Sequence, residues 1–269
     1  MARQGSAYSG GVDHPTLDDA VAAARHLVDE AERIVVLTGA GISTDSGIHD
    51  FRGPQGIWTK NPEAEKQATL SHYVGDPEIR KRVWRSRLES HGQDRPPNPG
   101  HLALFAVEQR AKLHTLVTQN VDGLHRAAGH DPELIVEVHG HMREVKCIGC
   151  GERAPMARAL DRVRAGEDDP PCRSCGGILK SATVAFGENL DPRDIVRMER
   201  AALACDLLLA AGTTLGVYPA AGMVPIAARN GSSIVIVNGQ PTEMDSLATV
   251  LVRGSLSEVL PEICGAGLM

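Results

Sequence analysis

Aromatic residues are scarce in this chain, at 3% of 269 residues, and the sequence contains no basic run. Proteins that bind nucleic acid usually present clustered positive charge, and those that bind single strands add aromatic side chains on which bases stack. The formal net charge is -6. We therefore expect no direct contact with nucleic acid.

Long apolar runs are absent as well. No stretch of about 18 apolar residues occurs, so the sequence predicts no transmembrane helix and no membrane partner. The first residues, MARQGSAYSGGVDHP, are polar and rich in glycine and lack the apolar core of a signal peptide. We expect a cytoplasmic protein with a flexible tail over residues 1–14. The oligomeric state stays unknown at this point.

Six apolar segments, each ending in glycine or polar residues, predict the fold class. Strands that are apolar along their whole length and are separated by helices are typical of a parallel sheet covered on both faces. We therefore expect an α/β fold with a Rossmann-like parallel sheet. Ligands of such sheets bind beyond the carboxyl ends of the strands, which here carry GAG, TQNVD, HG, GTT and NGQ. The segments are 33–39, 113–120, 134–140, 206–212, 233–239 and 249–254.

Two segments interrupt this alternation. Residues 61–97 are charged and helical and end in PPNPGH, a typical breaker of regular structure. Residues 141–185 hold paired cysteines and the turn GEDDPP. We predict that both are insertions that together build a smaller zinc-binding domain. The arginines Arg80, Arg82 and Arg87 around Trp84 predict a charged helix face, and a wall of the acyl pocket is the alternative. The Rossmann-like domain would then comprise residues 15–60, 98–140 and 186–264.

Four of the six cysteines form two C-x2-C pairs that are separated by 21 residues. In a cytosolic chain such pairs indicate a metal site rather than disulfides. Four thiolates make a closed tetrahedral zinc site, which stabilises a small domain and does not activate water. Two redox-active pairs are the disfavoured alternative, because neither pair opens a helix after a strand. The predicted ligands are Cys147, Cys150, Cys172 and Cys175.

Two glycine-containing loops indicate a nucleotide site. Gly39-Ala40-Gly41 follows a strand, so backbone N–H groups can approach a phosphate, and a following helix N-terminus would favour the anion. The signal is weak alone, because Ser43 occupies the place of a glycine in GxGxxG and a tight turn explains it equally well. A second loop starts at Gly212 and offers two threonine hydroxyls. Asn238 ends another strand and is placed to bond a ribose or an adenine edge.

Longer motifs make the prediction specific. GAGISTDSGIHDFRG, TQNVDGLH, EVHG, the two C-x2-C pairs, FGENL and GTTLGVYP follow one another along the chain. In order and spacing they resemble the motifs of bacterial-type sirtuins, the Sir2-family NAD-dependent protein lysine deacylases, over roughly residues 25–263. The resemblance implies that NAD is a co-substrate and that zinc is structural. It also implies acylated-lysine proteins as partners, nicotinamide release, and transfer of the acyl group to ADP-ribose.

The same resemblance implies three catalytic residues, His139, Asn120 and Asp122. His139 would take a proton from a ribose hydroxyl, which suits an imidazole with a pKa near neutrality. Asn120 and Asp50 would hold the nicotinamide carboxamide, an assignment that fits an amide and a carboxylate facing a group that both donates and accepts. The chain has eleven histidines, and His125 fits a structural hydrogen-bonding role better.

Further positions complete the implied site. Phe51 would shield the reactive carbon, while Arg52 and Gln119 would contact phosphate and ribose. The substrate positions would be Val184, Phe186 and Gly187, which line the acyl-lysine tunnel; a plain buried strand is the alternative. The implied cofactor-binding residues are Gly39, Ala40, Gly41, Ser43, Asp50, Phe51, Arg52, Gln119, Asn120, Asp122, Gly212, Thr213, Thr214, Asn238, Gly239, Gln240 and Leu256.

Some residues depart from the family pattern and leave the acyl preference open. His49 replaces a proline, Ser181-Ala182 replaces Pro-Asp, and Ala185 stands where an aromatic residue is common. Residues 83–90 contain no tyrosine, so the Tyr-x-x-Arg pair that binds acidic acyl groups in desuccinylating sirtuins is missing. We therefore disfavour succinyl and malonyl substrates.

Other functions remain as alternatives. Protein mono-ADP-ribosyl transfer would use the same activated ribose, and a deacylase specific for longer acyl chains would use the same site. A silent NAD or ADP-ribose sensor is disfavoured by the intact Asn120, Asp122 and His139. A zinc-ribbon nucleic-acid binder is disfavoured by the charge, and a dehydrogenase by the missing GxGxxG.

Overall fold

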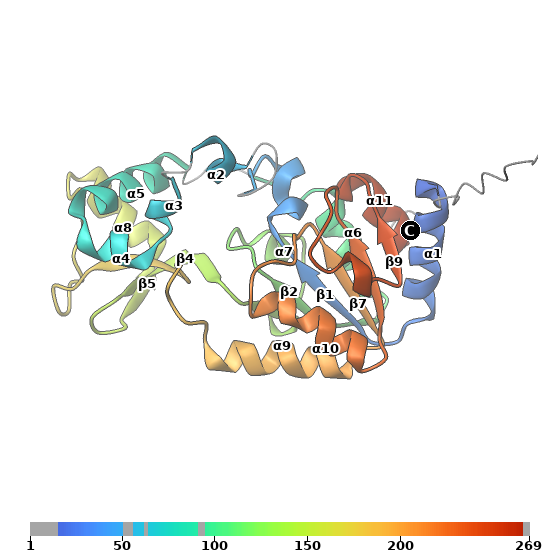
Figure 1. The fold of residues 1–269 in the computed structure, drawn as a ribbon. Helices are drawn as coiled ribbons and strands as arrows, with labels where there is room; N and C mark the ends of the chain where they lie inside the picture. The colour runs from blue at the N-terminus through green and yellow to red at the C-terminus, as the bar shows by residue number, and fades with distance from the viewer. Residues whose placement is uncertain (1–15, 51–55, 62–63, 91–94, 266–269) are drawn as a thin grey trace, which may run out of the picture.

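The structure is a computed structural model that describes residues 16–50, 56–61, 64–90 and 95–265. The predicted tail and the predicted cofactor residues Phe51 and Arg52 lie outside these ranges. All six predicted strand segments form one sheet, and its order is β3-β2-β1-β7-β8-β9 (Figure 1). Every neighbouring pair in it is parallel. The strands are β1 (Ile34–Thr38), β2 (Leu113–Thr118), β3 (Ile135–Glu137), β7 (Leu207–Ala211), β8 (Ser233–Val237) and β9 (Val250–Val252).

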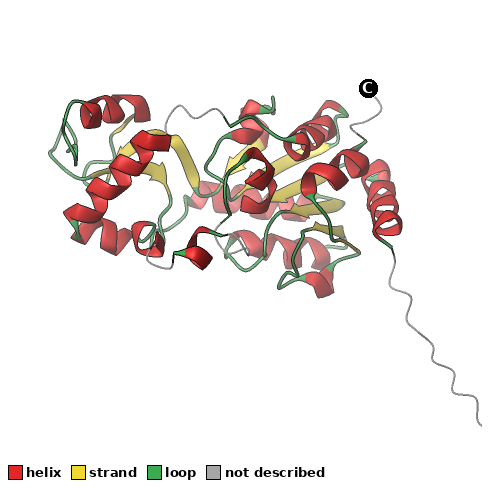
Figure 2. Cartoon of the chain, turned by 90° about the horizontal axis from the view of Figure 1, so that it is seen from above, coloured by secondary structure: helices red, strands yellow, loops and turns green. Residues whose placement is uncertain are grey.

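Helices cover both faces of this sheet (Figure 2). Within β1, Ile34 and Val36 join one buried apolar cluster, while Val35 and Leu37 join the other. Successive side chains of a strand point to opposite faces, so a strand apolar at every position must be covered twice. One cluster includes residues of α1 (Leu17–Glu30), α6 (Pro99–Gln109) and α11 (Leu256–Cys264). The other includes residues of α9 (Pro192–Ala204) and α10 (Met223–Arg229).

A capping box at Thr16 begins the first helix. The hydroxyl of Thr16 accepts a hydrogen bond from the Asp19 amide, and the Asp19 carboxylate accepts one from the Thr16 amide. Such a reciprocal pair satisfies two N–H groups that have no partner inside the helix. These bonds therefore fix the start of α1 at Thr16.

A second, antiparallel sheet carries the cysteines, in the order β5-β4-β6. Trp84, fully buried, packs with Val145 and Leu160 in its core. The predicted charged face on 80–87 is wrong: Arg80 is also buried, and its guanidinium pairs with Asp169 at 2.8 Å. The face points inward because Trp84, which lies between Arg80 and Arg87 at helical spacing, packs against apolar residues of the small sheet. The strands are β4 (Gly140–Cys147), β5 (Arg153–Pro155) and β6 (Leu179–Thr183).

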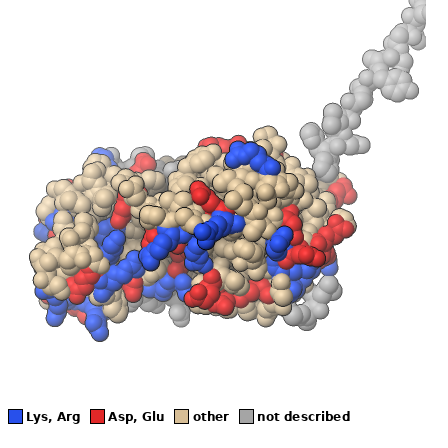
Figure 3. All heavy atoms as spheres, turned by 90° about the horizontal axis from the view of Figure 1, so that it is seen from below, with Lys and Arg blue, Asp and Glu red and all other residues tan. Residues whose placement is uncertain are grey.

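Short helices connect these parts. None of the described helices is both long and apolar enough to cross a membrane. Positive and negative side chains intermingle on the face seen from below (Figure 3). At the start of α9, Arg193 pairs with the N-cap residue Asp191 at 2.7 Å. The remaining α-helices are α2 (Ile57–Lys60), α3 (Ala64–Gln67), α4 (Leu70–Gly75), α5 (Pro77–Ser90), α7 (Leu124–Ala127) and α8 (Met156–Arg164). The 3-10 helices are η1 (Ala40–Ser46), η2 (Pro132–Leu134), η3 (Ala220–Gly222) and η4 (Asp245–Leu247).

Candidate functional site

The loops that follow β1, β2 and β7 lie side by side at the carboxyl edge of the parallel sheet. The Gln119 amide donates to the carbonyl of Thr38, and the Gly39 amide donates to the carbonyl of Ala211. The strand ladder thus continues by one residue into each loop. Because neighbouring parallel strands end at the same edge, residues far apart in the sequence meet there.

Glycine is required where the first and the third of these loops touch. A Cβ on Gly41 would lie 2.8 Å from the Cα of Gly212, and a Cβ on Gly39 would lie 2.7 Å from the Cβ of Thr213. Gly212 itself has a φ of +65°, which side chains rarely adopt. These glycines therefore allow two backbones to pack closely, whether or not a phosphate also approaches them.

The helix expected after the Gly39-Ala40-Gly41 turn differs from the prediction in type. The chain forms the 3-10 helix η1, whose N-cap is Gly39. Its residues AGISTDS are poor α-helix formers, because glycine, serine and aspartate favour local alternatives. The Asn98 side chain donates to the carbonyl of Ile42 at 2.7 Å and to the hydroxyl of Ser46 at 3.1 Å, which holds this tight turn.

Ser43, Asn120 and Asp122 form one hydrogen-bonded group. The Ser43 hydroxyl donates to Asp122 Oδ2 at 2.8 Å, and Asp122 Oδ1 accepts from the Leu124 amide at 2.9 Å. Asn120 Nδ2 donates to the carbonyl of Gly39 at 3.0 Å and to Ser43 Oγ at 3.2 Å. Burial raises the pKa of Asp122, and these two bonds to its carboxylate oppose that rise.

The ring of His139 is oriented by a carbonyl group. Its Nδ1 lies 3.0 Å from the carbonyl oxygen of Gln119. Since a carbonyl only accepts, Nδ1 carries the proton in the neutral ring and Nε2 is free to act as a base. Burial lowers the pKa of His139 below its ordinary value, so the neutral form is present at neutral pH. The Gln119 side chain in turn donates to Thr213 Oγ1 at 3.0 Å.

The segment predicted to bind substrate runs directly past His139. The Val184 amide donates to the main-chain carbonyl of His139 at 2.8 Å. Phe186 is 39% exposed, and its backbone forms a short parallel bridge with residues 68–70. Gly187, with a φ of +85°, ends this stretch. Val184 therefore lies next to the candidate base, and Phe186 and Gly187 follow it on the same stretch of chain.

Several predicted cofactor residues lie around this centre. Ala40 and Asp50 are partly exposed at the two ends of the first loop, and Thr214 is exposed after β7. Asn238 Nδ2 donates to the carbonyl of Gln240 at 2.8 Å, beside the exposed Gly239. Leu256 is the first residue of α11, which contacts η1.

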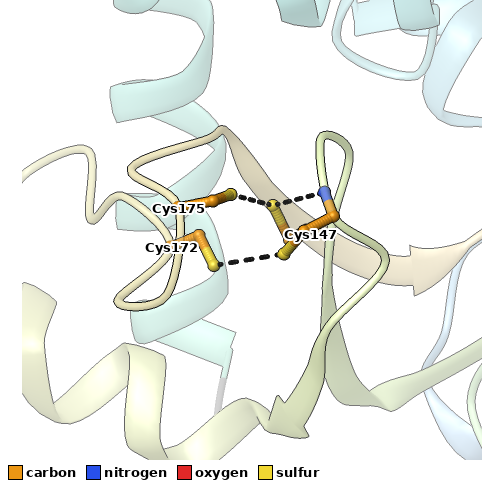
Figure 4. A group of neighbouring side chains, drawn as sticks. Cys147, Cys172 and Cys175 are labelled. Atoms are coloured by element: carbon orange, nitrogen blue, oxygen red, sulfur yellow. Dashed lines mark hydrogen bonds between the residues drawn. The ribbon is translucent and has the colours of Figure 1, made fainter.

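The four cysteines meet at the end of the small sheet, and Figure 4 labels three of them. Their sulfur atoms all lie within 4.8 Å of one another. Cys147 and Cys175 are 3.5 Å apart, and Cys150 and Cys172 are 3.7 Å apart. Tetrahedral zinc with Zn–S bonds of about 2.3 Å needs sulfur atoms about 3.8 Å apart, so the set fits structural zinc. The Cys150 amide points at Cys147 Sγ and the Gly177 amide at Cys175 Sγ, which helps to hold the thiolates.

Some residues of the site were missed by the sequence predictions. Asn98 and His101, in the segment interpreted as a breaker, cap α6 and bond to the first loop. The signal was present, since asparagine followed by proline is a common helix start. Glu137 was also missed. Its carboxylate forms ion pairs with Arg126 at 3.2 Å and with Arg143 at 2.7 Å, and so links β3 to α7 and β4. Single charged residues of this kind carry no local sequence signal.

Known proteins resemble this chain over most of its length. The family model described as "Sir2 family" matches residues 39–219. NAD-dependent protein deacetylase 2 of Streptomyces coelicolor is 49% identical over 232 residues, which are 86% of this chain and 95% of that protein. A structure titled "Structural Basis for the Mechanism and Regulation of Sir2 Enzymes" is 35% identical, with a TM-score of 0.82 over 94% of this chain and 100% of that one. Another, titled "Sir2-p53 peptide-NAD+", is 30% identical, with a TM-score of 0.78 over 90% of this chain and 96% of that one.

Proposed function

This chain belongs to the Sir2 family and is an NAD-dependent protein deacetylase, and we propose that the group around His139, Asn120 and Asp122 is its catalytic centre. The observation that carries this assignment is the convergence of these residues at one edge of the sheet. His139 is tied to the loop after β2 through Gln119, and Asn120 and Asp122 belong to that same loop. A base and a polar pocket are thus held together by one loop and a hydrogen bond to it.

NAD, as the co-substrate, supplies an activated ribose and the nicotinamide leaving group. The residues proposed to hold it provide backbone N–H groups, hydroxyls and amide groups at the strand ends, which suit phosphate and ribose. Asn120 uses both amide protons inside the protein, so its Oδ1 is the atom left to accept from a carboxamide. Positioning dominates such a site.

His139 is proposed as the general base. The carbonyl of Gln119 fixes its tautomer, and burial keeps the ring unprotonated at neutral pH. An imidazole must be neutral before it can accept a proton, and it must lie within hydrogen-bonding distance of the group that gives the proton up. His139 Nε2 would take the proton from a ribose hydroxyl after nicotinamide has left.

Residues 184–187 are proposed to hold the acyl-lysine peptide. An extended peptide adds readily to an exposed strand edge, and a related protein has been solved with a p53 peptide and NAD+. Phe186 is exposed beside the bridge to residues 68–70.

We further propose that residues 61–97 and 141–185 form a separate small domain, because Trp84, Val145 and Leu160 share one apolar core.

The test is mass spectrometry of an acetyl-lysine peptide, with and without NAD, which follows deacetylated peptide and free nicotinamide separately. We expect the wild type to form both products only with NAD. His139→Ala should lose peptide product by ~10²-fold or more, the scale of a lost general base, but should still release nicotinamide. Asn120→Ala should lose both. Normal deacetylation by His139→Ala would refute the assignment of the base.

The acyl preference is tested in the same assay. Peptides with acetyl, propionyl, longer and succinyl groups are compared at equal concentration. We propose acetyl as the preferred group and expect the succinyl peptide to be the poorest substrate, because residues 83–90 lack the tyrosine of the acidic-acyl pair. ADP-ribose mass on the peptide instead of acyl loss would favour the mono-ADP-ribosyltransferase alternative.

A further inference from the structure

Ser43 lies at the centre of a buried polar group behind the proposed NAD site. Its hydroxyl contacts the side chains of Asn120, Asp122 and His101, and the residue is 1% exposed. We propose that Ser43, supported by His101, is a positioning residue that fixes the Asn120 amide and the Asp122 carboxylate, rather than a direct contact of the cofactor. This inference rests on the proposed function of Asn120 and Asp122.

Because Ser43 is buried, its hydroxyl has no exposed surface that a ligand could contact. A hydroxyl has one proton to donate and two lone pairs to accept with. The proton goes to Asp122 Oδ2, at 2.8 Å, and one lone pair takes the Asn120 amide proton, at 3.2 Å. The second lone pair faces His101 Nε2 at 3.5 Å. Every bonding direction of the hydroxyl is therefore used inside the protein.

The neighbour of His101 sets its tautomer. The Asn98 amide N–H approaches His101 Nδ1 at 3.4 Å, so Nδ1 must accept and the ring proton must sit on Nε2. Nε2–H then points at Ser43 Oγ. Burial lowers the pKa of His101 to about 4, which keeps the ring neutral and this tautomer in place. Because His101 Nε2 is a donor, the Ser43 hydroxyl accepts from it and donates its own proton to Asp122.

The chain of bonds runs in one direction, from Asn98 through His101 and Ser43 to Asp122. The other oxygen of Asp122 is held by the Leu124 amide at 2.9 Å. The carboxylate is thus clamped from both ends, although its burial opposes ionisation. A buried polar group that loses one partner bears most of the desolvation penalty itself. Without Ser43, Asp122 would be free to turn or to protonate.

His101 and Asn98 come from the start of α6, whereas Ser43 lies in η1 and Asp122 follows β2. The arrangement therefore ties three separate segments to one carboxylate. The ring of His101 also packs on that of His125, with centroids 5.0 Å apart, and this contact limits rotation of the imidazole. Side chains held in this way preserve a catalytic geometry at a scale below an ångström.

The experiment uses the full-length zinc-loaded enzyme and two matched substitutions at one position. In His101→Asn, the amide oxygen can replace Nδ1 as acceptor for Asn98, but the donor to Ser43 is lost. In His101→Gln, the amide nitrogen can reach the place of Nε2 and restore that donor. Ser43→Ala and the double variant Ser43→Ala/His101→Asn complete the set. His130→Asn is the packing control, because His130 belongs to the same ring cluster and bonds Glu108 instead.

We expect Ser43→Ala to lower kcat/KM for NAD roughly 10- to 100-fold, the scale of one hydrogen bond to a charged group. His101→Asn should lose several-fold in the same constant, His101→Gln should recover most of it, and KM for the acetyl peptide should stay constant in both. The double variant should be no worse than Ser43→Ala, because His101 would act only through the serine. Thermal unfolding of each variant separates these effects from lost stability.

Additive losses in the double variant would overturn the proposal, as would equal losses in His101→Asn, His101→Gln and His130→Asn that follow the melting temperatures. Ser43→Ala with normal kcat/KM would also overturn it. The proposed function fails in a different way, through undiminished activity of Asn120→Ala and His139→Ala. Loss in those two variants, combined with normal Ser43→Ala, refutes the positioning role alone.

Discussion

The main-chain carbonyl of His139 accepts a hydrogen bond from the amide of Val184 at 2.8 Å, while the His139 ring bonds the carbonyl of Gln119. His139 thus holds the proposed substrate segment with its backbone, and its side chain is held by the loop that follows β2. These two hydrogen bonds therefore fix the distance between the proposed base and the proposed peptide-binding segment.

The pH dependence of turnover should report His139. Burial places its pKa below the ordinary 6.5, and the base acts only in the neutral form. We expect kcat/KM to be flat above about pH 6.5 and to fall as the pH drops through a lower value. Steady-state rates over a pH series measure this. An acid limb that begins above about pH 7 would contradict the assignment, and the exposed His26→Ala is the control with an unchanged profile.

Gly140 should be irreplaceable for steric reasons. Its φ is +70°, and a Cβ there would overlap the carbonyl oxygen of Ala182 in the neighbouring strand. We expect Gly140→Ala to destabilise the protein by about 3 kcal/mol or more, since conformational strain and overlap add. Urea unfolding measures the change.

Gly151 provides the matched control. Its φ is +75°, but no atom lies within 4 Å of a Cβ built there. Gly151→Ala should cost only about 1 kcal/mol, the strain of a left-handed alanine. Equal losses in the two variants would show that backbone conformation alone matters at Gly140.

Zinc removal should unfold the small sheet. The four cysteines lie within 4.8 Å of one another, and Cys147 and Cys172 are buried in its core. Metal analysis should find about one zinc per chain, and a strong chelator should abolish the near-ultraviolet signal of Trp84, because structural zinc supplies folding free energy. Re-addition of zinc should restore it. A metal-free protein of unchanged stability would contradict the prediction, and Cys205→Ser is the control that keeps the metal.

Acid should destabilise the fold through three buried histidines. Burial lowers the pKa of His101 to about 4 and also lowers those of His125 and His130. The unfolded chain binds protons below about pH 6.5 and the folded chain does not, so stability is full above that pH and decreases as the pH falls. His101 alone should contribute about 2 kcal/mol of loss between about pH 8 and pH 5. Urea midpoints at both values measure it, and His101→Gln should flatten the dependence.

The sequence predicted the large sheet well because its strands are mostly apolar and are followed by glycine or polar residues. Leu207–Ala211, buried at every position, is an example. The prediction failed where the position of a side chain depends on a partner that is distant in the sequence. Nothing near Arg80 announces its partner Asp169, 89 positions away. Likewise, Ser43 matched a cofactor motif, but only the structure places Asn120, Asp122 and His101 around its hydroxyl.

The order of strands also has a consequence for synthesis on the ribosome. Strand β1 pairs with β2 and with β7, and β7 ends only at Ala211. The central strand of the large sheet therefore waits for most of the chain, and such distant pairing folds slowly. The strands β4 to β6 and the four cysteines between or within them, by contrast, are complete by Thr183. We expect the nascent chain to acquire its zinc before its central strand has found both neighbours, so metal supply would act on the yield of folded enzyme at an early, local step.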